Sequence, residues 1–167
     1  MFQEKSDCAS PLTESTVKNL VFQILVALNY LKNLQILHRD LKPENIMLES
    51  PNSLIKIIDF GFGLDLSHSH DELRNYILGT MTYLSPELIE NQEYCCESDI
   101  WSLGVIIFSL LANRNPFYDR DDKILFRLIQ SCDYEFKDRI WSEVTSECKQ
   151  FIESCVEPNI SKRLTPT

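Results

Sequence analysis

The sequence predicts a mainly α-helical fold with a small β element. Apolar residues recur at intervals of three and four over residues 13–32, and residues 100–111 are apolar almost throughout. Only two short apolar runs, 46–48 and 54–58, have the length and the intervening turn residues expected of strands. Helical periodicity therefore dominates the chain, and strand signals account for little of it.

Length and composition fit one domain with a hydrophobic core. The 167 residues are 44% hydrophobic and 25% charged, which is ordinary for a globular protein. We therefore expect a single domain over residues 1–167. The net charge of −9 would repel a phosphate backbone, and the longest basic run is Lys162-Arg163, so nucleic acid is not an expected partner.

The sequence shows no signal for secretion or for membrane insertion. The apolar run 103–111 is too short for a membrane segment, and polar residues 3–7 interrupt any signal-peptide core. The six cysteines form no C-x-x-C pair, so a disulfide framework is not expected. These features favour a cytoplasmic location with reduced thiols, and a redox role for Cys95-Cys96 is the alternative.

The first helix is expected over residues 13–32, with Thr13 as its N-cap after Pro11. Its apolar face consists of Val17, Leu20, Val21, Ile24, Leu25, Leu28 and Leu31. Their spacing predicts an amphipathic helix that packs one face against the core.

The middle of the chain is expected to be short strands and a long loop. Residues 46–48 and 54–58 should be two strands joined by the turn 51–53. Residues 61–82 are polar and lack periodicity, which predicts a long loop, and loops of that length in compact domains are usually functional.

The C-terminal half is expected to be helical. A helix starting at Ile100 is apolar almost all round and should lie at the centre of the domain. Three amphipathic stretches follow, near residues 121–130, near 145–155 and beyond Pro158.

The stretch His38-Arg39-Asp40-Leu41-Lys42-Pro43-Glu44-Asn45 has the residues that phosphoryl transfer requires. Such a reaction depends on positioning and on neutralising charge. Asp40 can accept the proton of an attacking hydroxyl, Lys42 can place a positive charge beside the phosphate, and Asn45 can offer an oxygen to magnesium. The alternative is a solvated charged turn.

A second motif, Asp59-Phe60-Gly61, follows the second predicted strand, and Asp59 lies fourteen residues after Asn45. A carboxylate at the end of an apolar strand is a natural second magnesium ligand. The pair His68-x-His70 is an alternative metal motif, although two exposed loop histidines usually bind nothing.

These motifs identify a resemblance to the eukaryotic protein kinase family, of Ser/Thr type, from about Thr13 to the C-terminus. Ser85-Pro86-Glu87 resembles the family's Ala-Pro-Glu and closes an activation segment over residues 59–87. The resemblance implies the large, C-terminal lobe, truncated and without the small lobe, because the family's glycine-rich loop and strand lysine have no match here. It also implies that Asp99 holds the backbone of the His-Arg-Asp turn and that Glu87 pairs with Arg163.

The resemblance also implies a set of site residues, with ATP and Mg²⁺ as cofactors. The implied catalytic residues are Asp40, Lys42, Asn45 and Thr80. The implied ATP-binding residues are Met47, Lys42, Glu44, Asn45 and Asp59. Asn45 and Asp59 are the implied magnesium ligands, and Thr80 should bridge Asp40 and Lys42.

Within the family, Asn115-Pro116-Phe117 and residues 141–147 resemble the calcium/calmodulin-dependent or the calcium-dependent kinase group. Protein substrates are implied, and Glu44 is expected to receive an arginine upstream of the target hydroxyl. Ile77, Met81 and Leu84 should line an apolar pocket for the residue after it. The expected function is transfer of the γ-phosphate of ATP to Ser/Thr hydroxyls, the isolated chain being inactive without a small lobe. The alternative is an inactive kinase-like decoy or scaffold.

Overall fold

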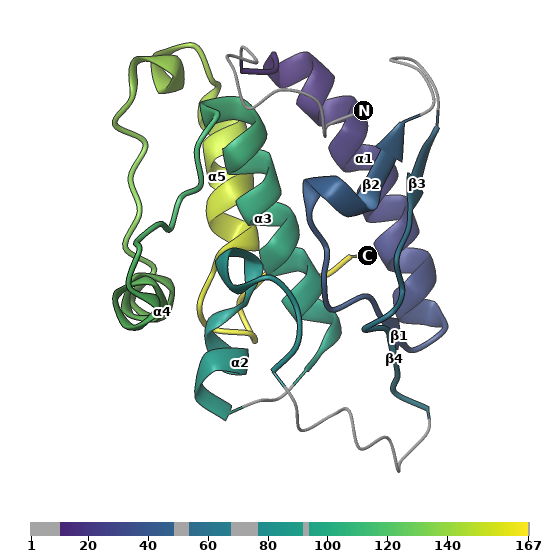
Figure 1. The fold of residues 1–167 in the computed structure, drawn as a ribbon. Coiled ribbons are helices and arrows are strands. Elements are labelled where there is room, and N and C mark those ends of the chain that lie inside the picture. The colour runs from purple at the N-terminus through teal and green to yellow at the C-terminus, as the bar shows by residue number, and fades with distance from the viewer. Residues whose placement is uncertain (1–10, 49–53, 68–76, 92–93, 167) are drawn as a thin grey trace.

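The structure is a computed structural model that describes residues 11–48, 54–67, 77–91 and 94–166. Figure 1 shows the buried helix α3 (Cys96–Ala112) beside α5 (Ser146–Cys155) in the middle of the fold, with α1 (Glu14–Asn33) and two small sheets on one side and α4 (Asp122–Ser131) on the other. The mainly helical fold with a small β element is confirmed.

Helix α1 matches its prediction closely. Thr13 is the N-cap, and its Oγ1 accepts a hydrogen bond from the backbone N–H of Thr16. The helix buries one stripe against the core, formed by Val17, Leu20, Val21, Ile24 and Leu28. Leu25 and Leu31 are half-buried at the edge of that stripe.

The structure has two separate two-stranded antiparallel sheets. The predicted strands form β2 (Ile46–Leu48) and β3 (Ile55–Ile57). A second sheet pairs β1 (Ile36–Leu37) with β4 (Leu64–Asp65) and was not predicted. The prediction of a continuous loop over 61–82 is therefore wrong at β4 and at the 3₁₀ turn Met81–Tyr83. The predicted turn at 51–53 lies outside the described residues.

Helix α3 is the centre of the hydrophobic core, as its composition predicted, but it begins at Cys96 rather than near Ile100. Gly104 allows α3 to approach the end of α5 closely. A Cβ atom at residue 104 would lie 2.7 Å from the Cβ of Cys155 and 2.8 Å from the Cγ1 of Val156. These separations are shorter than side chains tolerate, so close packing of the two helices requires glycine.

The remaining helices frame the C-terminal half. The short α2 (Pro86–Asn91) was not predicted, whereas α4 and α5 lie where amphipathic stretches were found. The helix expected beyond Pro158 is absent from residues 158–166, which form turns. Asn159 explains the difference, because its side-chain oxygen accepts from the N–H and hydroxyl of Ser161, an alternative to helical hydrogen bonding.

No helix among the described residues combines the length and apolarity that crossing a bilayer requires. Cysteines 95, 96, 132, 148 and 155 are all free thiols in the described part of the chain.

Candidate active site

The loop that contains Asp40 is anchored to helix α3 through Asp99. Oδ2 of Asp99 accepts the backbone N–H of His38 at 2.8 Å, and Oδ1 accepts that of Arg39 at 3.0 Å. Arg39 adopts φ 68°, a left-handed conformation that is costly for a side chain with a Cβ. Burial raises the pKa of Asp99, while the two N–H donors act in the opposite direction. The two hydrogen bonds hold the strained turn in place.

Asp40, Lys42 and Thr80 form a hydrogen-bonded group at the end of this turn. Lys42 Nζ donates to Asp40 Oδ2 at 2.6 Å and to Thr80 Oγ1 at 2.9 Å. Thr80 in turn donates both its backbone N–H and its hydroxyl to Asp40 Oδ1, each at 2.9 Å. Thr80 therefore bridges the acid and the lysine, although it lies 40 residues from Asp40 in the sequence.

Gly79 makes this approach possible. Its backbone has φ 108°, and an added Cβ would lie 2.5 Å from the carbonyl oxygen of Arg39. Any other residue would push the segment that contains Thr80 away from the Asp40 loop.

Asn45 and Asp59 lie at adjacent ends of β2 and β3. The backbone N–H of Ile58 donates to the carbonyl of Asn45 at 2.9 Å, which extends the strand pairing to the residue just before Asp59. Asn45 Nδ2 donates to the Asp40 carbonyl at 2.8 Å. Because only the amide nitrogen can donate, this bond fixes the side-chain orientation and leaves the amide oxygen as the end that a cation would use.

Asp59 is exposed and has φ 63°, and its Oδ1 accepts the N–H of Gly61. An amide oxygen and a carboxylate are hard ligands that suit Mg²⁺. The part of the chain that the structure describes contains no cluster of three or more His, Cys, Asp or Glu side chains placed to hold a metal. His68 and His70 lie outside that part.

His38 has a structural position behind the loop. Its ring contacts Phe60 with centroids 4.8 Å apart. Its Nε2 is 2.9 Å from the carbonyl oxygen of Ile58, and since a carbonyl only accepts, Nε2 carries the proton. Nδ1 accepts the N–H of Asp40. Both ring nitrogens are therefore occupied by backbone partners.

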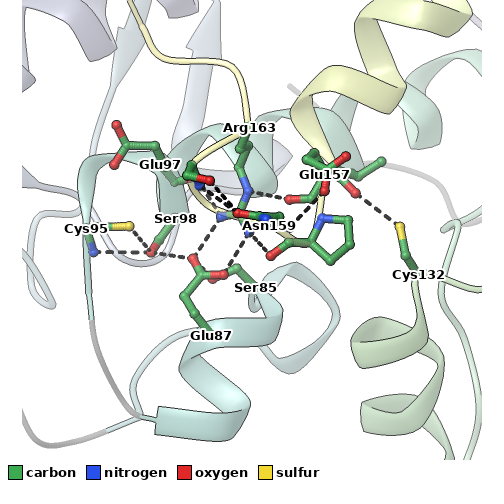
Figure 2. A network of polar contacts seen from close by, with 12 residues as sticks. Ser85, Glu87, Cys95, Glu97, Ser98, Cys132, Glu157, Asn159 and Arg163 are labelled. Atoms are coloured by element: carbon green, nitrogen blue, oxygen red, sulfur yellow. Dashed lines mark hydrogen bonds and ion pairs between the residues drawn. The ribbon is translucent and has the colours of Figure 1, made fainter.

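Glu87 and Arg163 form the predicted pair at the centre of a buried polar network (Figure 2). Arg163 donates Nη1 and Nη2 to the two carboxylate oxygens of Glu87, each at 2.8 Å. The hydroxyls of Ser85 and Ser98 add bonds of 2.6 and 2.9 Å to the same carboxylate. Burial alone would raise the pKa of Glu87, but the bonds from Arg163 and Ser85 outweigh it and hold the pKa below its ordinary value.

The cysteines do not have the environment of reactive thiolates. Burial raises the pKa of Cys95 and of Cys96, and nearby carboxylates add to the effect. A thiolate nucleophile needs the opposite shift, so the surroundings disfavour the redox alternative.

The sequence as a whole matches the family model of the protein kinase domain over residues 2–167. The chain belongs to the protein kinase family. It is 40% identical over 153 residues to human calcium/calmodulin-dependent protein kinase type 1B, covering 92% of this chain and 44% of that protein. It is 38% identical to mouse calcium/calmodulin-dependent protein kinase type IV, over 92% of this chain and 33% of that protein. The predicted likeness to this Ser/Thr group is confirmed.

A third relative of this chain is myosin light chain kinase A of Dictyostelium discoideum, with 36% identity over 93% of this chain and 52% of that protein. The chain thus spans about half, or less, of the length of these relatives. The family model and the three relatives establish the family for nearly the whole sequence.

The other predicted site residues lie nearer the surface. Glu44 is exposed in the 3₁₀ turn Pro43–Asn45, and Met47 is 41% exposed on β2. Ile77 and Met81 are 41% and 45% exposed, and their place in an apolar pocket for the residue after the target stays a prediction. Leu84 cannot line it, because it is only 4% exposed and packs into the core.

The sequence analysis missed Tyr94 and Ser98. Ser98 bonds Glu87, and Tyr94 bonds the backbone of Leu78. Tyr94 lies just before the buried helix α3, and Ser98 lies in its first turn. Their only signal in the sequence was their closeness to Asp99.

Proposed function

We propose that this chain is the C-terminal lobe of a Ser/Thr protein kinase, spanning residues 1–167, that transfers the γ-phosphate of ATP to serine or threonine hydroxyls of proteins. The observation that supports this most directly is the Asp40–Lys42–Thr80 group. It places a carboxylate, an ammonium and a hydroxyl within hydrogen-bond distance of one another, on two segments that only the fold brings together. Phosphoryl transfer needs this kind of fixed charge arrangement.

Each residue of the group has a role in the proposed reaction. Asp40 accepts the proton of the substrate hydroxyl as that oxygen attacks phosphorus. Lys42 balances the charge of the transferring phosphoryl group. Thr80 keeps both side chains in place, since it donates to the acid and accepts from the lysine. General-base assistance of this kind is worth about 10²–10⁴ in rate.

Asn45 and Asp59 would hold Mg²⁺, which would neutralise charge on the phosphates of ATP when bound. The fixed amide of Asn45 and the exposed carboxylate of Asp59 provide the oxygen donors that such an ion prefers. Met47 offers exposed apolar surface on β2 for the adenine base, and Glu44 and Lys42 complete the proposed ATP-contacting set.

The test is phosphate transfer from labelled ATP to a peptide by the natural protein, with Asp40→Asn as the variant. We expect Asp40→Asn to lower kcat by at least about 10²-fold. Asp122→Asn, an exposed acid in the first turn of α4, is the control and should retain kcat. Equal turnover of Asp40→Asn and the natural protein would disprove the assignment. Peptide binding without turnover in the natural protein would favour the decoy or scaffold function.

We further propose that the substrate peptide is basic upstream of the target hydroxyl. Glu44 is an exposed carboxylate beside the Asp40 loop, and a carboxylate can bind a guanidinium through two hydrogen bonds. Exposed Ile77 and Met81 would contact an apolar residue after the target. In a peptide-library assay, Glu44→Ala should weaken the preference for basic residues upstream of the target hydroxyl. Glu90, an exposed acid on α2, provides the control, and Glu90→Ala should leave that preference unchanged. A preference for acidic peptides would contradict this proposal.

A further inference from the structure

Tyr94 lies two residues before helix α3 and binds the segment that contains Thr80. Its hydroxyl accepts the backbone N–H of Leu78 at 2.7 Å and donates to the carbonyl oxygen of Leu78 at 2.9 Å. One hydroxyl thus satisfies both backbone groups of a residue 16 positions away. The contact fixes the backbone two residues before Thr80.

The ring of Tyr94 is held from its other side by Arg39. The guanidinium carbon of Arg39 lies 4.7 Å from the ring centroid, a cation–π distance. Arg39 Nε also donates to the carbonyl oxygen of Phe62. The Arg39–Tyr94 pair therefore connects Phe62, just after the Asp59-Phe60-Gly61 motif, with Leu78, just before Gly79-Thr80.

The surroundings leave Tyr94 little room to move. The cavity that it lines together with Asp40, Thr80, Tyr83 and Asp99 has a volume of only about 10 Å³. That is about the space of a single water molecule, so the ring cannot shift far without displacing its neighbours.

We propose that Tyr94 is a positioning residue for the kinase site: its hydroxyl fixes the Leu78 backbone, and through Gly79 it holds Thr80 on Asp40. The catalytic part of this role rests on the proposed function. Thr80 reaches Asp40 Oδ1 through both its N–H and its hydroxyl, so a small displacement of its backbone breaks two bonds at once. Loss of the Tyr94 hydroxyl should therefore affect the Asp40–Lys42–Thr80 group, although Tyr94 is not itself one of the proposed catalytic or ATP-binding residues.

Tyr94→Phe tests the proposal because it removes the hydroxyl and keeps the ring against Arg39. The matched control is Tyr134→Phe, which removes a hydroxyl from another half-buried tyrosine in the aromatic cluster with Phe108 and Phe136. The readouts are hydrogen–deuterium exchange of the peptide covering residues 77–81 in the natural protein, and kcat and KM for a peptide substrate.

In Tyr94→Phe the amides of Leu78 and Thr80 should exchange roughly tenfold faster or more, the change expected from two lost hydrogen bonds, and the control should match the natural protein. Peptide kcat/KM should fall by a similar factor, mainly through kcat, because Thr80 positions the residues of the chemical step. Unchanged exchange at 77–81 would overturn the proposal whatever the kinetics show, and faster exchange with unchanged kcat/KM would overturn the catalytic role. If the natural protein has no turnover, the proposed function fails, and exchange at Thr80 alone decides whether Tyr94 holds it.

Discussion

Replacing Arg163 with alanine should destabilise the fold severely, because this side chain neutralises a buried carboxylate. The Arg163 side chain is 0% exposed and that of Glu87 is 5% exposed. Besides its two bonds to Glu87, Arg163 donates to the carbonyl oxygens of Glu157 and Glu97, at 2.8 and 3.1 Å. Figure 2 shows that these partners come from separate segments around the guanidinium. Its loss removes the cation from a buried carboxylate and takes a donor from three carbonyl groups, those of Glu157, Glu97 and Pro158.

The magnitude follows from the burial. Removing one partner of a buried ion pair costs about 3–5 kcal/mol, since the remaining charge stays in a medium that solvates it poorly. With a urea m-value of about 2 kcal/mol per molar, the unfolding midpoint should fall by about 1.5–2.5 M. Replacing both partners, as in Glu87→Leu with Arg163→Met, should cost less than the sum of the single changes, because no charge is left buried.

The assay is urea denaturation of the natural protein followed by circular dichroism. Asp138→Ala is the control, because it breaks an ion pair with Arg114 whose side chains are 47% and 41% exposed. Such exposed pairs contribute about 0–1 kcal/mol. If Arg163→Ala lowered the free energy of unfolding by less than about 1 kcal/mol, or by no more than Asp138→Ala, the stabilising role of the pair would be refuted.

Three further predictions concern packing, pH and thiols. Gly104→Ala should lower the free energy of unfolding by about 1–3 kcal/mol, because the added methyl group would overlap with Cys155. The same urea titration measures this change, and an unchanged midpoint would contradict the close packing of α3 against the end of α5. The folded-state pKa of Glu87 lies below its ordinary 4.5, so its contribution to stability is complete above that pH and is lost as the pH falls through the folded value. Glu87→Gln should therefore make the free energy of unfolding fall less steeply with decreasing pH. An unchanged fall would show that protonation of Glu87 does not cause it. Burial raises the pKa of Cys132 and Cys148 to about 11 and that of Cys155 to about 12, so alkylation of the native protein in mildly alkaline buffer should be slow at all three and fast after unfolding. Mass spectrometry measures it, and rapid native alkylation would show that burial does not protect these thiols.

Local patterns in the sequence were enough for the regular elements near the site. Thr13 and the apolar spacing after it defined α1, and the continuous apolar run after Ile100 correctly placed α3 in the core. Pairing of β2 with β3 followed from two apolar runs separated by a short turn. Each of these signals lies within a few residues of the structure that it produces.

Two of the errors concern contacts between segments that are distant in the sequence or the direction of a side chain. Strands β1 and β4 are two residues each and pair Ile36 with Asp65, so neither has a recognisable pattern of its own. The polar composition near Leu64 masked the strand, although Leu64 itself is fully buried. Leu84 was assigned to a surface pocket, because an apolar residue in a loop gives no sign of which side faces the core.

The sequence by itself determined the family, through contiguous residues such as Asp40, Lys42 and Asn45, because motif chemistry depends on spacing along the chain. The resemblance already implied that Thr80 bridges Asp40 and Lys42, and the structure has both contacts. Only the tertiary structure decided how Ser98 joins Glu87 and how Tyr94 reaches Leu78. These contacts form between segments held together by packing around α3, and hydrogen bonds are short and directional. Composition and periodicity constrain which face of an element is buried, but they do not specify which distant polar atoms come within bonding distance.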